Sequence, residues 1–237
     1  MKTKIEFIHI MSREEFKPKK DTGTRNLVVG MLLLILLVGA GFSYYSNQSA
    51  KNVPLPPTVA ADKGYGIVFN PTATPKVDIY FDFQCPICKD FEIINGGFIS
   101  EIAAQKKAQV VFHPMSFIGP ESILAASAAG CAADQNKFLD FYYGMYQVQP
   151  VKENSGVWDL EGLTNVGKNV GITDDGFKQC IKDGKYLKWV RNVANASAAA
   201  NINGTPTVLV DGKALDRNTQ YMDATAFRAA LTAAGVK

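Results

Sequence analysis

The sequence predicts an α/β protein in which a β-sheet carries an inserted block of helices. Residues 76–83 (KVDIYFDF) alternate and are rich in aromatic and β-branched side chains, which is typical of a strand. The residues from Glu121 to about Ala200 instead follow a helical pattern, broken near Gln149-Pro150 and at Gly171. A sheet with such a helical layer belongs to the α/β class.

The remaining elements follow from the same two periodicities. Short alternating or apolar runs predict strands, and longer amphipathic runs predict helices. Further strands are expected at 64–70, 109–117 and 206–211, helices from Pro86 to Gln105 and from Asp223 to Ala234, and turns at Asn70-Pro71 and Asp211-Gly212.

Charge is distributed unevenly along the chain. The 237 residues include 25 basic and 22 acidic side chains, for a net charge of +3. Residues 1–25 hold seven basic against four acidic residues, so the rest of the chain is neutral. A nucleic-acid-binding domain needs a basic face, so the sequence disfavours a nucleic-acid partner.

An apolar segment near the N-terminus predicts a membrane anchor. Residues 27–45 (LVVGMLLLILLVGAGFSYY) contain no charge, and their length nearly spans a hydrocarbon core of about 30 Å. Basic residues precede the segment, which places the N-terminus in the cytoplasm. We therefore expect a basic cytoplasmic segment over 1–25, a single transmembrane helix in the lipid bilayer over 26–45, and a linker over 46–63.

A cleaved signal peptide is the alternative, although its basic region would be unusually long. In both cases the domain over 64–237 lies outside the cytoplasm, in an oxidising compartment where disulfides persist.

The sharpest motif is Cys85-Pro86-Ile87-Cys88, between the strand 76–83 and the helix that follows. This spacing at a helix N-terminus brings two sulfurs within disulfide range. The unpaired N–H groups of the helix end stabilise a thiolate on Cys85 and lower its pKa, and Pro86 suits the first helical turn. We expect Cys85 to be the exposed attacking sulfur and Cys88 the resolving one.

Two simpler interpretations of the motif are less favoured. Half of a zinc site is one, but zinc needs four ligands and Cys131, Cys180 and His113 form no second paired motif. A structural disulfide is the other, but four-residue loops of this kind are usually redox-active. We expect no metal and no cofactor, since the sequence also lacks a Gly-rich phosphate loop and a paired-carboxylate site.

The other two cysteines, Cys131 and Cys180, both lie in the helical block. In an oxidising compartment two such cysteines more often pair than stay free, so we expect a structural disulfide, with two buried thiols as the alternative. His113 is interpreted as a surface residue at a strand end. Five aromatic residues at helical spacing are expected in the core: Phe138, Phe141, Tyr142, Tyr143 and Tyr146.

The run from Tyr80 to Phe91 (YFDFQCPICKDF) resembles the active-site segment of the DsbA-like branch of the thioredoxin superfamily. Gly204-Thr205-Pro206-Thr207 resembles its cis-proline loop, and 121–200 its inserted helical domain. The whole is most similar to membrane-anchored DsbA-like proteins of Gram-positive, especially actinobacterial, bacteria. The resemblance covers 64–237 and implies a thioredoxin-like fold with an inserted helical domain, here preceded by a single N-terminal transmembrane helix.

The resemblance also implies roles for individual residues. Cys85 attacks, Cys88 resolves, and Thr205-Pro206 lies against the sulfurs, where the backbone of Thr205 pairs with an extended substrate strand. Ile87 stands where DsbA of Gram-negative bacteria has histidine, so a smaller depression of the Cys85 pKa is expected. Asp82 is a candidate proton relay for Cys88, with a solvated strand-end aspartate as the alternative.

We therefore expect a monomeric, membrane-tethered thiol-disulfide oxidoreductase. As an oxidase it would donate the Cys85–Cys88 disulfide to exported proteins as they fold, and the resemblance implies a membrane partner, similar to DsbB or to vitamin K epoxide reductase, that reoxidises the dithiol. A disulfide reductase for a specific client is the alternative enzyme and needs a more negative reduction potential. A non-catalytic peptide-binding chaperone is the alternative from another class, against which the intact dithiol argues.

Overall fold

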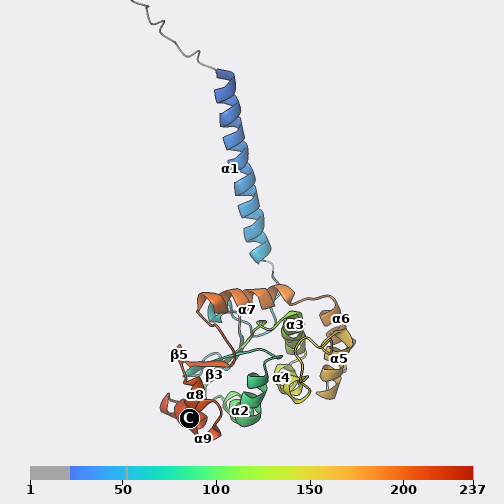
Figure 1. Cartoon of the computed structure of the whole chain (residues 1–237), viewed down its shortest axis with the longest axis vertical. Coiled ribbons are helices and arrows are strands. Elements are labelled where there is room, and N and C mark those ends of the chain that lie inside the picture. Colours follow the sequence, from blue (N-terminus) through green and yellow to red (C-terminus); the bar gives the residue numbers. More distant parts are fainter. Residues whose placement is uncertain (1–21, 52, 237) are drawn as a thin grey trace, which may run out of the picture. The chain divides into compact units, whose positions relative to one another are not determined.

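The computed structural model in Figure 1 describes residues 22–51 and 53–236, without the side chains of residues 22, 24, 25 and 42–51. It divides into two units, Met1–Asn52 and Val53–Lys237, each with its own internal contacts. The second unit holds all four cysteines.

The first unit contains one helix, α1 (Thr22–Lys51), among its described residues. No helix in the described part of the chain is both long enough and apolar enough to cross a membrane. The structure therefore does not support the transmembrane helix predicted over 26–45. Most of the predicted basic segment, 1–25, lies outside the described residues.

A five-stranded sheet forms the centre of the second unit, in the strand order β1-β3-β2-β4-β5. The strands are β1 (Ile67–Phe69), β2 (Lys76–Phe81), β3 (Gln109–Pro114), β4 (Thr207–Val210) and β5 (Lys213–Ala214). β2 and β3 pair in parallel, whereas the other neighbouring strands pair antiparallel. Because β2 is central and nearly all of it is buried, its carboxyl end is a fixed point from which the next helix begins.

Helices cover both faces of this sheet and form a layer at its side. They are η1 (Ala61–Lys63), α2 (Pro86–Ala104), α3 (Pro120–Asp134), α4 (Phe138–Gln147), α5 (Leu160–Asn169), α6 (Asp175–Lys182), α7 (Leu187–Ala199), α8 (Arg217–Gln220) and α9 (Ala224–Ala233). Figure 1 shows α7 over one face of the sheet, α2 and α9 over the other, and α3 to α6 at the side. This is the predicted sheet with an inserted helical block.

Several predicted elements end earlier than expected, for a common reason. β3 ends at Pro114 rather than at residue 117, because the backbone N–H groups of Phe117 and Ile118 turn toward the carboxylate of Asp82, at 2.9 and 3.2 Å. β2 likewise ends at Phe81, just before that aspartate.

The short helix α8 was not predicted, and Asp216 caps it by accepting from the Asn218 N–H at 2.9 Å.

The predicted aromatic core of the helical layer is confirmed. Four of the five residues are buried and Tyr143 is half-buried. They pack against the end of the sheet: the rings of Phe81 and Tyr142 lie 4.7 Å apart at 80°, an edge-to-face geometry. The side layer is therefore joined to β2 through aromatic contacts directly beneath the dithiol segment.

Within the segment predicted as a linker over 46–63, residues from Val53 onward belong to the second unit. Val59 forms a β-bridge with Ile67, and Val53 and Val59 both pack against the core. Pro56 is buried, and an added Cβ at Gly130 of α3 would lie 3.0 Å from its ring. Val53, Pro56 and Val59 of this Pro-containing stretch thus have partners, which composition alone did not indicate.

Candidate active site

The dithiol sits where β2 passes into α2. Cys85 is the N-cap residue of α2, with φ −71° and ψ 117°, and Pro86 occupies the first helical turn. The Cys85 N–H donates to Asp82 O at 3.0 Å, and Cys85 O accepts the first helical bond from Lys89 N at 3.2 Å. Both thiols are free; Cys85 is 7% exposed and Cys88 1%. Cys85, expected to be exposed, is therefore buried, although less completely than Cys88.

The two thiols differ in proton affinity. A hydrogen bond from the Cys88 thiol, helped by the N–H groups of Ile87 and Cys88 at the helix end, lowers the pKa of Cys85 to about 6 against the opposing effect of burial. Burial raises the pKa of Cys88 well above its usual value, and the neighbouring Cys85 raises it further. At neutral pH the structure therefore favours one thiolate, on Cys85, beside one neutral thiol.

The predicted proline loop lies against this pair. The Thr205-Pro206 peptide bond is cis, and the loop connects α7 to β4. The Cys85 sulfur lies 3.6 Å from Thr205 O, to which the thiol form donates. Thr205 is half-buried and Pro206 is buried, so a main-chain carbonyl faces the nucleophile.

Asp82 is buried, with no exposed surface, so the interpretation of a solvated strand-end aspartate is wrong. Its Oδ1 accepts from Gln84 N at 2.9 Å and from Ser122 Oγ at 2.7 Å, while its Oδ2 accepts the two N–H groups that follow β3. Burial raises the pKa of the Asp82 carboxyl, although these donors oppose the shift. Its carboxylate therefore ties the segment before α2 to the segment after β3 and to helix α3.

A second carboxyl group near the dithiol was missed by the sequence reasoning. Glu92 lies four residues after Cys88, on the buried face of α2. Its Oε1 accepts a hydrogen bond from Tyr142 Oη, while its Oε2 is buried without a hydrogen-bond partner. Burial raises the pKa of Glu92 to about 8, so the group is mostly protonated at neutral pH. The i to i+4 spacing from Cys88 was the available signal.

Buried amide side chains were also missed. Gln84 donates to Ser122 Oγ at 2.9 Å and to Asn154 Oδ1 at 3.2 Å, and Gln149 donates to main-chain carbonyls of the dithiol segment. In the sequence, Gln149 stands before a proline, and this pair predicts only a break between two helices. Polar residues at a break between two amphipathic helices are a weak signal for such contacts.

The predicted structural disulfide is present. Cys131 on α3 and Cys180 on α6 are joined at an S–S distance of 2.04 Å and link two helices of the side layer. His113, expected at the surface, is instead 1% exposed. Its Nε2 lies 3.0 Å from Asp78 Oδ1, and its ring stacks on Tyr80 at 4.1 Å, because Gly64 and Gly66 leave room for the imidazole above the sheet.

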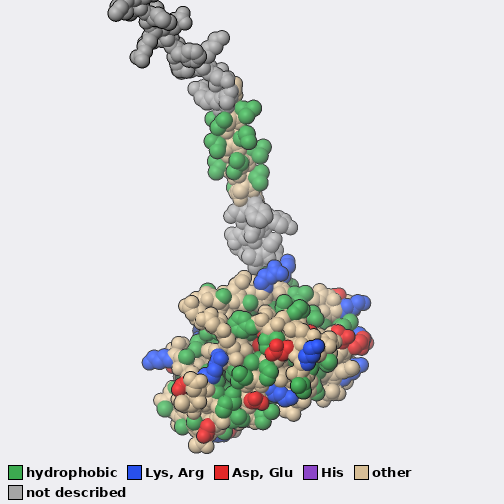
Figure 2. Space-filling model, in the orientation of Figure 1, with side chains coloured by type: hydrophobic (Ala, Val, Ile, Leu, Met, Phe, Trp, Pro, Cys, Tyr) green, Lys and Arg blue, Asp and Glu red, His purple; other side chains and the backbone are tan. Residues whose placement is uncertain are grey.

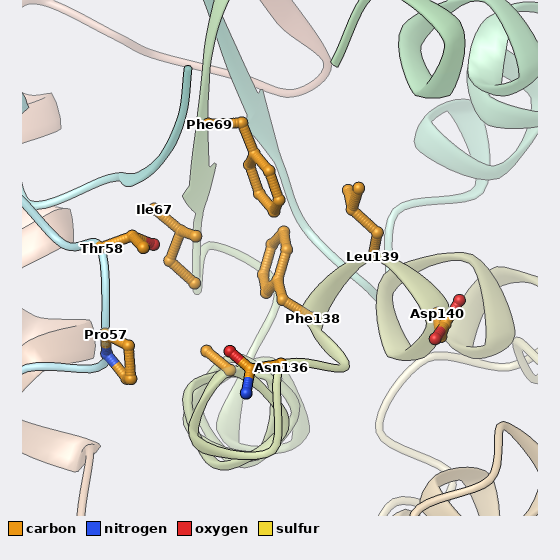
Figure 3. Close-up of a pocket in the computed structure, with 9 residues that line it drawn as sticks. Pro57, Thr58, Ile67, Phe69, Asn136, Phe138, Leu139 and Asp140 are labelled. Carbon is orange, nitrogen blue, oxygen red and sulfur yellow. The ribbon is translucent and has the colours of Figure 1, made fainter. Parts of the chain in front are cut away.

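A separate hollow of about 380 Å³ lies at the β1 edge of the sheet. Figure 3 shows its apolar floor, where the rings of Phe69 and Phe138 face each other with Ile67 beside them. Thr58, Asn136 and Asp140 supply polar groups around it. None of the dithiol or proline-loop residues lines this hollow, so the reactive sulfurs and this cavity are different places.

Figure 2 shows basic and acidic side chains scattered among apolar ones over the visible face of the second unit, rather than gathered into a basic patch. Among the described residues, no three His, Cys, Asp or Glu side chains gather into a possible metal site.

The sequence model of the family described as thioredoxin matches residues 65–229, which include the dithiol, the helical layer and the proline loop. This chain belongs to the thioredoxin family. A member of known structure, the thiol-disulfide oxidoreductase MdbA from Actinomyces oris, has 25% sequence identity, with a TM-score of 0.66 over 76% of this chain and 92% of that one. The oxidised structure of BdbD from Bacillus subtilis, at 22% identity, shares the fold with a TM-score of 0.62 over 77% and 96%.

The thioredoxin-family relatives support the predicted branch. A probable disulfide bond formation protein D from Bacillus anthracis is 30% identical over 146 residues, 59% of this chain and 66% of that protein. The match thus spans just under two thirds of that relative's length. The relatives include disulfide bond formation proteins and thiol-disulfide oxidoreductases from Gram-positive bacteria, so the predicted DsbA-like resemblance is confirmed.

Proposed function

We propose that this chain is a thiol-disulfide oxidoreductase that works as an oxidase, donating the Cys85–Cys88 disulfide to other proteins. The observation that carries the proposal is the contrast in proton affinity between the two sulfurs, with a pKa of about 6 at Cys85 and a raised pKa at Cys88. A fold that stabilises the thiolate of the reduced form makes the disulfide a better oxidant.

The exchange runs in two steps. A substrate thiolate attacks Cys85 Sγ of the disulfide, forming a mixed disulfide while Cys88 leaves as a thiolate and takes up a proton. A second substrate thiolate then attacks the substrate sulfur of the mixed disulfide, and Cys85 leaves as a thiolate. The substrate loses two electrons and gains a disulfide, and the enzyme gains the two electrons as a dithiol. Because a thiol of lower pKa leaves faster, the second step benefits from the position of Cys85 at the helix end.

The proline loop supports a role in holding the substrate. Thr205 O lies 3.6 Å from the Cys85 sulfur, so an extended peptide that pairs with the backbone of Thr205 would bring its cysteine next to Cys85 Sγ. For Asp82 we propose a proton-relay role toward Cys88. The support is its burial and raised pKa beside the dithiol segment, although its carboxylate is already held by four donors.

We further propose that the domain works outside the cytoplasm, on exported proteins, and that a membrane protein similar to DsbB or vitamin K epoxide reductase reoxidises the dithiol. The Cys131–Cys180 disulfide supports this location, because such bonds persist in oxidising compartments and are rare in the cytosol. The apolar segment 26–45 would hold the domain at the membrane, and the second unit would act as a monomer.

The reduction potential tests the direction of electron flow. We would equilibrate the purified full chain with glutathione buffers and count alkylated thiols at Cys85 and Cys88, with a Cys85→Ser chain as the control. A pKa of about 6 lies between the thiol pKa values of DsbA and thioredoxin. We therefore expect a potential between about −120 and −270 mV, the values of those two proteins. A value at or below about −270 mV would reverse the proposed direction and indicate a reductase.

A further inference from the structure

The side-chain amide of Gln149 makes an unusual contact with the dithiol segment. Its Nε2 donates to Phe83 O at 2.7 Å and to Cys85 O at 3.0 Å. Gln149 follows the end of α4 in the side layer and is only 8% exposed. A residue of the helical insertion thus holds main-chain carbonyls on both sides of Gln84, the residue before Cys85.

These two hydrogen bonds restrain the main chain before and after Cys85. The Phe83 carbonyl fixes the peptide plane that enters Gln84, and the Cys85 carbonyl fixes the plane that enters α2. Cys85 O also accepts the first helical hydrogen bond from Lys89 N, so it has one donor from its own helix and one from the side layer. The peptide plane between Gln84 and Cys85 is held separately, because the Cys85 N–H donates to Asp82 O at 3.0 Å, so both planes that flank Cys85 are restrained and with them the direction of its Cα–Cβ bond.

We propose that Gln149 is a positioning residue for the dithiol: its amide keeps Cys85 oriented so that the sulfur meets the N–H groups at the start of α2. The inference rests on the proposed role of Cys85 as the exchanging sulfur. It adds a function for the helical insertion, which through this side chain sets the reactivity of a cysteine that belongs to the sheet and α2.

Two effects act in the same direction. Correct orientation keeps the Cys85 sulfur near the N–H groups of Ile87 and Cys88, which stabilise its thiolate. The Gln149 N–H also offsets the partial negative charge of Cys85 O, which otherwise disfavours a thiolate on the same residue. Removing the amide donor therefore raises the pKa of Cys85.

Other titratable groups around the dithiol must stay constant in the test. They are Asp82 before α2, Cys88 and Glu92 on α2, and Tyr146 on α4, the last of which interacts electrostatically with all three and with Cys85. Gln149 itself carries no charge. A substitution by methionine, which has similar length and no donor, removes the two hydrogen bonds without adding a charge to this group.

The chain offers a matched control on α2, the helix that Cys85 caps. Asn95 of α2 is also a buried amide that donates to two main-chain carbonyls, Phe91 O at 3.2 Å and Tyr221 O at 2.7 Å. Replacing it by leucine breaks the same number and kind of hydrogen bonds at a distance of ten residues from Cys85. If Gln149→Met acted on Cys85 only by lowering the stability of the fold, Asn95→Leu should have the same effect on Cys85.

The experiment compares the reduced full chain with its Gln149→Met and Asn95→Leu variants. Each is alkylated with iodoacetamide between pH 4 and 9 to obtain the pKa of Cys85, and each is equilibrated with glutathione. For Gln149→Met we expect the midpoint of alkylation to move to higher pH and the equilibrium constant for oxidising glutathione to fall about fivefold, the size of one ordinary hydrogen bond. For Asn95→Leu we expect no change in either quantity.

Gln149→Glu is a second variant that tests the proposal if Gln149→Met fails to fold, because glutamate keeps the size and shape of the side chain. Its carboxylate would face the two carbonyls, so we expect a larger shift of the Cys85 alkylation midpoint to higher pH than with methionine. If the wild-type chain exchanges with glutathione but both Gln149 variants match it, the positioning role is wrong. If the wild-type chain does not exchange at all, the proposed function fails instead.

Discussion

Replacing Glu92 by glutamine should change how stability depends on pH. Glu92 is buried on α2, its Oε2 has no hydrogen-bond partner, and burial raises its pKa from 4.5 to about 8. The folded state therefore holds a proton that the unfolded chain releases above pH 4.5. Stability is fully present below that value and falls as the pH rises through about 8, because the folded state binds the proton more tightly.

The size of the effect follows from the shift. Each pKa unit corresponds to about 1.4 kcal/mol, so the wild-type chain should lose about 4 kcal/mol of unfolding free energy at this group between pH 5 and pH 9. Glutamine cannot ionise and keeps an oxygen that accepts from Tyr142. The Glu92→Gln variant should therefore be roughly level with the wild type at pH 5, or lower by about 1 kcal/mol for an unpaired amide N–H, and clearly more stable at pH 9.

Urea unfolding of the full chain at pH 5, 7 and 9 measures this difference. The chain is kept oxidised, so that Cys85 and Cys88 do not titrate. Glu101→Gln is the control on the same helix: Glu101 contacts Lys107 at 2.6 Å, which lowers its pKa, so its replacement should not raise stability at high pH. Parallel pH profiles for the wild type and Glu92→Gln would refute the buried, protonated state of Glu92.

Two further predictions concern packing and the disulfide. Gly96→Ala should lower the unfolding free energy by about 1 to 3 kcal/mol, because its Cβ would lie 2.9 Å from Glu92 Oε2 and 3.0 Å from the Tyr143 ring. Gly97→Ala has nothing within 4 Å of its added Cβ and should be neutral or slightly stabilising. Equal urea midpoints for the two variants would contradict this. Replacing both Cys131 and Cys180 by serine should lower the free energy of unfolding in urea by about 4 kcal/mol and leave the reduction potential of Cys85–Cys88 unchanged. A shifted potential would show that this disulfide does more than stabilise the side layer.

The dithiol and the structural disulfide could be predicted because each depends on few residues, whereas the proline loop was implied by the family resemblance. The Cys-Pro-Ile-Cys motif is contiguous, and its position at a strand-to-helix junction follows from local periodicity. The Cys131–Cys180 pair followed from counting cysteines in an oxidising compartment. None of these needed knowledge of which distant loops meet.

The burial of polar residues could not be predicted in this way. Asp82 and His113 both stand at strand ends, where a carboxylate or imidazole is usually solvated. Asp82 is enclosed because the chain after β3 turns its N–H groups onto the carboxylate, and His113 because glycines at 64 and 66 leave space for its ring. Such enclosure depends on the path of segments that lie more than 30 residues away in the sequence.

The same dependence on distant segments explains why two cysteines on one helical turn behave differently. Cys85 at the helix end has N–H groups, a neighbouring thiol and an accessible edge, whereas Cys88, three residues on, is enclosed by the core. Sequence places both thiols at the start of α2, but the elements packed on α2 bury Cys88, and the side layer reaches the main chain of Cys85 through Gln149. A disulfide donor needs one sulfur that leaves easily and one that takes up a proton, and here that difference follows from the burial of Cys88 and from the hydrogen bond that its thiol gives to Cys85.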